Sequence, residues 1–397
     1  MLLPSLAKHR FVFGMALLAS VLVLSLLAVL GITTFRAARS KPSLAHLFDT
    51  TVRPATSEKT VRPGGAATSI AASTDGGLIV FSFTAGRDPM DGVQVLPVAT
   101  LRGENLDVGS GLQWAKVAFA PDGATFLVGG NWIVPRGRGS LQKWEPQGVL
   151  QIWDARSRSR RHRIVVGDED VGHIAYDPKG RYVYFTYSWL EDKSIRRLDL
   201  RTEKITDVIT AASHFTAPWT PKGSNELCVS PDGRTLVVGS TDGTLVWSLR
   251  EAKERFLGPP SRSVAISPDG SQLALACYRN LQVVDTGTGK RIRRLTIDDR
   301  ALDKDRRFAR FSSDGQILAA GMNDCNEFPS YLAVWKTPDY SPLAVFCCHN
   351  CAMLDMCFMP NTHTLVTASM DDTVSFWDLD KPHSTNCSNG ERTEPTY

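Results

Sequence analysis

Three cysteines and a histidine stand within five positions near the end of the chain, at Cys347, Cys348, His349 and Cys351. Thiolate and imidazole groups are ligands that suit zinc. Structural zinc sites usually draw on two separated pairs of ligands, and this single cluster lacks that spacing. We therefore expect neither a metal nor another cofactor, and the eight cysteines show no legible disulfide framework.

Motifs of known enzymes are missing from the chain. It has no G-x-S-x-G elbow, no H-E-x-x-H helix and no G-x-x-x-x-G-K-[ST] loop. An acid/base pair could still be assembled from distant residues, for example among Asp170, His173 and His214. We expect a protein that is not an enzyme, with a site in a central channel as the alternative.

A four-residue pattern of the type Ser-x-Asp-Gly recurs along the chain. Its copies begin at Ser73, Ala120, Asp177, Ser230, Ser267, Ser312 and, in degenerate form, Met359. Successive copies are 37 to 57 residues apart, close to the period of a four-stranded propeller blade. Each copy lies between two alternating apolar runs, which predicts a hairpin closed by an Asp-Gly turn. Seven copies predict an all-β, seven-bladed propeller.

A third apolar run follows most copies and ends with a characteristic pair of residues. Trp153 and Trp377 are each followed by Asp, and Trp247 and Trp335 keep the aromatic half of this pair. On these residues the stretch 69–379 resembles the WD-repeat family of β-propellers. The resemblance implies an interaction scaffold more than an enzyme.

The last unit is the best copy of the repeat. It resembles the family's hydrogen-bonding set at His349, Ser369, Asp371 and Trp377, which would stabilise the blade and perform no catalysis. The chain ends soon after the third strand of this unit. In the family the N-terminal segment usually supplies the missing strand, and here the run that starts at Lys59 is the candidate.

The N-terminal part of the chain is strongly apolar. Residues 11–35 contain no charge, and at about 1.5 Å per residue they are long enough to cross a hydrocarbon core of about 30 Å. We predict a short flank (1–10), a transmembrane helix (11–35), a linker with the ring-closing strand (36–62), the propeller (63–380) and a disordered tail (381–397). A cleaved signal peptide is the alternative, although its apolar region would be shorter.

The anchor would make this a single-pass membrane protein. Basic residues flank both ends of the apolar segment, so the side of the membrane that holds the propeller stays open.

The resemblance also sorts the connections between strands by face. In WD-repeat propellers the loops after the second and fourth strands share one face, and the longest connections here, 131–148, 187–193, 209–226 and 322–330, fall on it. That face holds Trp132, Trp144, Trp189 and Trp219, and Trp is common at binding hot spots. We predict that it binds a protein partner, with packing of the rings onto the blades as the alternative.

The other face has a basic run at Arg156, Arg158, Arg160, Arg161 and Arg163. Such a run could bind anionic lipids or an acidic protein, or it could consist of solvated turn residues. The formal net charge of the whole chain is only +4, and no aromatic residues interleave with these arginines, so a nucleic-acid partner is not expected. We expect a membrane-anchored, monomeric propeller that acts as a protein-interaction scaffold.

Overall fold

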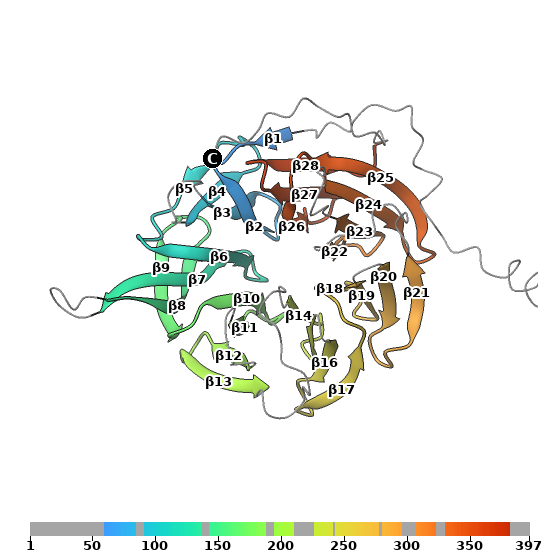
Figure 1. Cartoon of the computed structure of the whole chain (residues 1–397), viewed down its shortest axis with the longest axis horizontal. Coiled ribbons are helices and arrows are strands. Elements are labelled where there is room, and N and C mark those ends of the chain that lie inside the picture. The colour runs from blue at the N-terminus through green and yellow to red at the C-terminus, as the bar shows by residue number, and fades with distance from the viewer. Residues whose placement is uncertain are drawn as a thin grey trace, which may run out of the picture. The chain divides into compact units, whose positions relative to one another are not determined.

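The computed structural model describes residues 59–84, 91–136, 143–187, 194–209, 226–240, 243–277, 280–295, 307–322 and 330–381. Within these residues the protein is all β, and 28 strands form seven antiparallel sheets of four strands each. The sheets are arranged as blades around a central axis (Figure 1). The predicted seven-bladed propeller is therefore confirmed.

The strands of a blade are named a to d, from the axis outward. Blade 1 contains β2 (Ala66–Ala72), β3 (Leu78–Thr84), β4 (Asp91–Pro97) and β5 (Glu104–Asn105). Blade 2 contains β6 (Leu112–Phe119), β7 (Thr125–Arg136), β8 (Lys143–Asp154) and β9 (Arg160–Gly167). Blade 3 contains β10 (Val171–Tyr176), β11 (Tyr182–Tyr187), β12 (Ile195–Asp199) and β13 (Lys204–Ile209). Blade 4 contains β14 (Leu227–Val229), β15 (Thr235–Val238), β16 (Thr244–Ser248) and β17 (Lys253–Gly258).

The remaining three blades follow the same order. Blade 5 contains β18 (Ser263–Ile266), β19 (Gln272–Cys277), β20 (Asn280–Asp285) and β21 (Arg291–Leu295). Blade 6 contains β22 (Arg307–Phe311), β23 (Ile317–Met322), β24 (Ser330–Lys336) and β25 (Ser341–His349). Blade 7 contains β26 (Met353–Phe358), β27 (Thr364–Ser369), β28 (Val374–Asp378) and, as its outer strand, β1 (Lys59–Val61).

Strand β1 closes the ring from the N-terminal side of the propeller. It pairs antiparallel with β28, with Lys59 opposite Phe376 and Val61 opposite Val374. The first and last described segments of the chain are thus joined in one sheet.

The recurring tetrapeptide forms the turn between strands a and b. All seven turns are five residues long, at 73–77, 120–124, 177–181, 230–234, 267–271, 312–316 and 359–363. In the first, the Ser73 hydroxyl donates to Asp75 Oδ1 (2.6 Å) and accepts from the amide of Leu78 (2.9 Å). The hydrogen bond from Ser73 lowers the pKa of Asp75. Gly76 has φ of 71°, a conformation that glycine adopts without steric cost, which explains the fourth residue of the pattern.

The hydrophobic core lies between the blades. Each of seven clusters of buried side chains joins two neighbouring blades. Because successive side chains of a strand point to opposite faces, β24 sends Leu332 and Val334 toward blade 7 and Ala333 and Trp335 toward blade 5. Every blade therefore depends on both of its neighbours for burial.

One expected loop is largely strand. The b and c strands of blade 2 remain paired from Thr125 opposite Asp154 to Arg136 opposite Lys143. This long hairpin extends away from the ring in Figure 1. The stretch 131–148 is therefore mostly a β-ladder, which leaves 137–142 as the connection.

The predicted flank (1–10), the predicted transmembrane helix (11–35) and most of the tail lie outside the described residues. The residues that are described contain no helix long and apolar enough to cross a membrane.

Candidate functional site

The two faces of the propeller differ in their connections. The connection face comprises the b–c and d–a connections, and the turn face comprises the a–b and c–d turns. Connections on the connection face range from two residues (278–279) to seventeen (210–226), whereas every a–b turn has five. Variation in length is thus concentrated on the connection face.

Trp132 is the only one of the four predicted tryptophans whose side chain lies in the described part of the chain. Its ring is 3% exposed, and its Nε1 donates to the carbonyl of Val108 (3.3 Å). The guanidinium carbon of Arg163 lies 6.0 Å from the ring centroid. Trp132 therefore packs the connection 106–111 onto blade 2.

The other three predicted tryptophans are not described to the same extent. Trp144 lies in β8 opposite Pro135, but its side chain is outside the described residues, as are Trp189 and Trp219 entirely. Their contact with a partner stays a prediction.

A tryptophan that the sequence reasoning passed over is exposed instead. Trp114 is the third residue of β6, and its side chain is 57% exposed. It lies in a β-bulge between Gln113 and Lys116 and has φ of 56°. The sequence signal was a break in the alternation of apolar residues along the strand. Leu112 and Trp114 stand at even-numbered positions, whereas the buried Ala115 and Val117 stand at odd-numbered ones.

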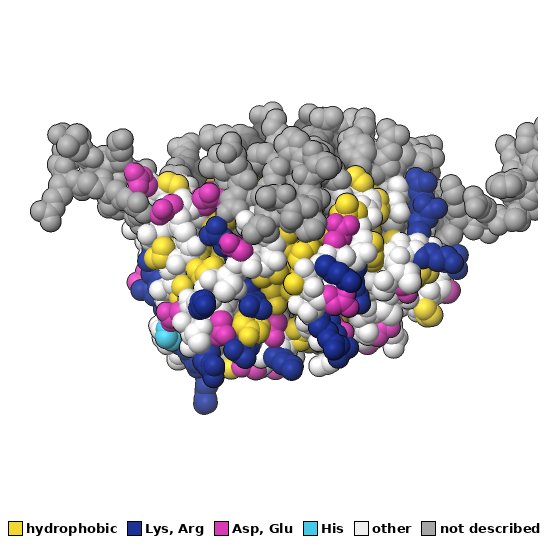
Figure 2. All heavy atoms as spheres, turned by 90° about the horizontal axis from the view of Figure 1, so that it is seen from below, with side chains coloured by type: hydrophobic (Ala, Val, Ile, Leu, Met, Phe, Trp, Pro, Cys, Tyr) yellow, Lys and Arg dark blue, Asp and Glu magenta, His cyan; other side chains and the backbone are white. Residues whose placement is uncertain are grey.

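The five predicted arginines do not form one turn. Arg156 and Arg158 belong to the c–d turn of blade 2, whereas Arg160, Arg161 and Arg163 lie in its outer strand, β9. Arg158 pairs with Glu104, Arg161 with Asp154, and Arg163 donates to the side-chain oxygen of Gln147 (3.1 Å). In the edge-on view of Figure 2, basic side chains are interspersed with acidic ones. Lipid or acidic-protein binding by these arginines stays a prediction.

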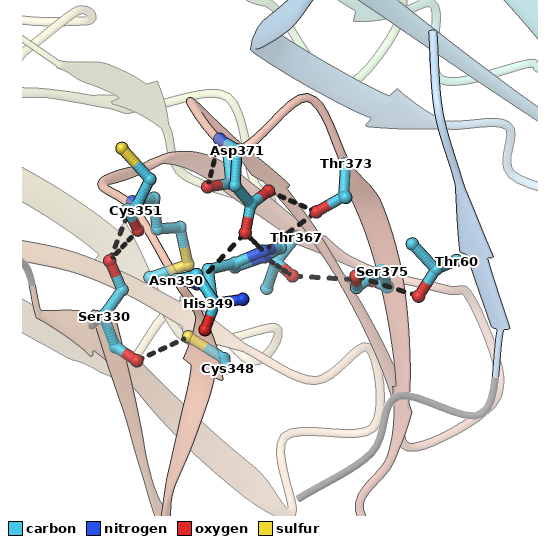
Figure 3. A network of polar contacts seen from close by, with 12 residues as sticks. Thr60, Ser330, Cys348, His349, Asn350, Cys351, Thr367, Asp371, Thr373 and Ser375 are labelled. Carbon is cyan, nitrogen blue, oxygen red and sulfur yellow. Dashed lines mark hydrogen bonds and ion pairs between the residues drawn. The ribbon is translucent and has the colours of Figure 1, made fainter. Parts of the chain in front are cut away.

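A buried polar network joins the end of β25, in blade 6, to β27 and β28 of blade 7 (Figure 3). His349 Nδ1 lies 3.1 Å from Asp371 Oδ2, and His349 Nε2 lies 2.7 Å from the hydroxyl of Thr367. The indole of Trp377 donates to the same hydroxyl (2.8 Å). Burial opposes ionisation of Asp371, but the hydrogen bond from His349 lowers its pKa overall.

The serine assigned to this network has a different role. Ser369 donates to the carbonyl of Ala352 (3.1 Å) and accepts from the amide of Asp371 (3.1 Å). The hydroxyl that links His349 to Trp377 belongs to Thr367, two residues earlier on β27. Both residues point to the same face of the strand, so the sequence pattern alone did not separate them.

The cysteine and histidine cluster does not converge on one point. Cys347 is disulfide-bonded, which the sequence did not indicate. The thiol of Cys348 donates to the carbonyl of Ser330 (3.3 Å), and burial raises its pKa well above the ordinary value. No group of His, Cys, Asp and Glu side chains within the described ranges is arranged to hold a metal ion.

A cluster of charges surrounds Arg310 of the inner strand β22. One of its terminal nitrogens lies 2.6 Å from Glu226 Oε1 and 3.1 Å from Asp355 Oδ1. Asp355 in turn accepts from the amide of Ile70 (3.1 Å) and the hydroxyl of Ser69 (3.3 Å). Burial opposes the charge of Arg310, but the two carboxylates raise its pKa. These bonds join the inner parts of blades 4, 6, 7 and 1.

Two residues of the enzyme alternative are also described. His173 lies in β10, where burial, followed by the charges of Lys116 and Arg310, lowers the pKa of its imidazole well below the ordinary value. Asp170 precedes β10, and burial raises its pKa. His214 is outside the described residues.

Comparison with known proteins agrees with this architecture. Residues 219–247 and 340–378 match the family model described as WD domain, G-beta repeat. The first stretch includes strands a to c of blade 4, and the second runs from β25 to the end of β28. No curated protein matches the chain. The chain is therefore a seven-bladed β-propeller that contains two repeats matching the WD-domain model.

Proposed function

We propose that this chain is a membrane-anchored scaffold that binds a protein partner on its connection face. WD-repeat propellers are typically non-enzymatic scaffolds, and a rigid ring that displays connections of variable length suits this role. The observation that carries the proposal is the contrast between seven five-residue a–b turns and connections of two to seventeen residues on the other face. Loops that vary on a constant framework are where binding surfaces usually lie.

The channel supports a scaffold over an enzyme. A general acid or base must be able to exchange a proton with a substrate. The carboxylates Glu226 and Asp355 are each paired with Arg310. Their arrangement is the one expected of charges that stabilise the ring.

Membrane attachment rests on the apolar segment 11–35. It contains no charge over 25 residues, which suits a transmembrane helix better than the shorter apolar region of a signal peptide. We expect the full chain to remain in the membrane pellet after alkaline carbonate extraction. A Leu24→Arg variant should shift toward the soluble fraction, because a charge at the centre of a span is costly. A wild-type chain in the soluble fraction would contradict the anchor.

The partner face can be tested by site-specific photo-crosslinking in the full-length protein. One crosslinker replaces Met370, which is 47% exposed in the b–c turn of blade 7. The matched control replaces Lys179, which is exposed in an a–b turn. We expect a discrete crosslinked protein from position 370 and none from position 179. The reverse result would assign the partner to the turn face.

A further inference from the structure

Trp114 differs from the other large apolar residues of the blades in its exposure. Side chains of tryptophan are usually well buried, and the five other described tryptophan rings are at most 5% exposed. Trp114 is the third residue of the inner strand of blade 2, near the end of the strand that adjoins the connection face. It therefore displays an indole ring on the face to which we assign the partner.

The backbone at Trp114 is strained. Positive φ is unfavourable for bulky residues, and Trp114 adopts 56° inside a strand. All other non-glycine residues with positive φ in the described ranges lie in turns: Leu101, Arg158, Glu203, Ala252, Tyr340, Asn361 and Asp372. Local strain of this kind persists where the surrounding structure enforces it, and it gathers at functional sites.

Acidic residues occur in two connections of the connection face near the start of β6. Exposed Asp107 belongs to the connection that leads into β6, and Asp168 and Asp170 belong to the connection that leads into β10. β6 and β10 are inner strands of neighbouring blades and begin at the same face.

Strands β6 and β10 pack against each other. Trp114 is the third residue of β6 and Asp170 directly precedes β10, so both lie at the ends of these strands that adjoin the connection face. Lys116 is the basic residue closest to Trp114 in the sequence, and it lies deeper along the strand.

We propose that Trp114 is the anchor of the connection face and that it binds an arginine side chain of the partner. A guanidinium group stacks on an indole face, and nearby carboxylates favour its positive charge. A large aromatic residue that gains burial on binding is typical of an interface hot spot. The identity of this contact rests on the proposed function, since it names the chemistry of the partner on that same face.

The test uses the purified full-length chain in detergent and fluorescence anisotropy of a labelled peptide. The probe is a peptide in which arginine alternates with glycine and serine, and its control replaces each arginine by the uncharged isostere citrulline. We expect saturable binding of the arginine peptide, at least about tenfold weaker binding of the citrulline peptide, and loss of affinity as the salt concentration rises.

Trp114→Gly separates binding from folding. Glycine removes the indole but tolerates the positive φ, so the midpoint of thermal unfolding should stay or rise while affinity falls about tenfold or more. Leu257→Ala is the matched control, because Leu257 is 52% exposed but lies in the outer strand β17, and its affinity should be unchanged. Asp170→Asn should weaken binding by a smaller factor.

Several outcomes would overturn the assignment. They are equal affinity of the two peptides, equal affinity of wild type and Trp114→Gly, or a lower midpoint of unfolding for Trp114→Gly, which would show a structural role for the indole. If position 370 crosslinks a partner while the arginine peptide does not bind, the face is correct and the chemistry inferred for Trp114 is wrong. If neither occurs, the connection face itself is wrong.

Discussion

The hydroxyl of Thr367 should be worth more to the fold than that of its neighbour Ser369. In wild type the network is satisfied with the imidazole proton of His349 on Nδ1, facing Asp371, so that Nε2 accepts from Thr367 and Thr367 accepts from the Trp377 indole. Thr367→Val keeps the shape of the side chain and removes both contacts. The indole N–H of Trp377 and the imidazole Nε2 of His349 then each lose a buried hydrogen bond.

The size of the expected loss in the free energy of unfolding follows from how deeply the two affected groups are buried. The ring of Trp377 is 2% exposed and His349 is 5% exposed, so water has little access to replace the lost bonds. Each unsatisfied buried group costs about 1–3 kcal/mol, and we expect Thr367→Val to lower the free energy of unfolding by about 2–4 kcal/mol. Ser369→Ala should cost only about 1 kcal/mol, since Ala352 and Asp371 are partly exposed and water can take its place.

Urea unfolding followed by circular dichroism measures both losses through the transition midpoint. A double-mutant cycle with Trp377→Phe adds a check, because the two substitutions should be non-additive when they remove the same hydrogen bond. A Thr367→Val protein within about 0.5 kcal/mol of wild type, or one more stable than Ser369→Ala, would refute this account of the network.

Three further results are expected. Arg310→Met should lower the free energy of unfolding by about 3–5 kcal/mol in urea titrations, because it removes the positive charge that pairs with Glu226 and Asp355. A loss below about 1 kcal/mol would contradict this pairing. The hydrogen bond to Asp380, and then that to Asp314, raises the pKa of the His363 imidazole above 6.5. The charged imidazole therefore stabilises the fold below pH 6.5, and this stabilisation is lost as the pH rises through the raised pKa. The difference in the midpoint of thermal unfolding between wild type and His363→Gln should shrink toward pH 8. Cys347 should resist alkylation in denatured protein until it is reduced. If Cys347 is blocked in protein taken directly from cells, the propeller lies in an oxidising compartment.

Features carried by local sequence were predictable. A Ser-x-Asp-Gly turn forms from hydrogen bonds within about five residues, as at Ser73, so its recurrence reports the number of blades without reference to the rest of the fold. The last unit lacked a fourth strand, and the family resemblance placed that strand in the segment before the first blade, where β1 lies beside β28.

Contacts between distant segments were not predictable in the same way. Arg310 meets Glu226 of blade 4 and Asp355 of blade 7 only because the ring brings inner strands together at the axis. The choice of Thr367 over Ser369 depends on how far along β27 the rings of His349 and Trp377 reach.

The exposure of individual tryptophans also separates what local sequence determines from what contacts between distant segments determine. The sequence by itself determined seven repeats and the order of strands within them, because turns and alternation are properties of neighbouring residues. Only the tertiary structure decided that Trp132 is covered by the connection 106–111 while Trp114 is left in solvent. Burial depends on which blade and connection pack against a side chain, and that information is spread over the whole ring.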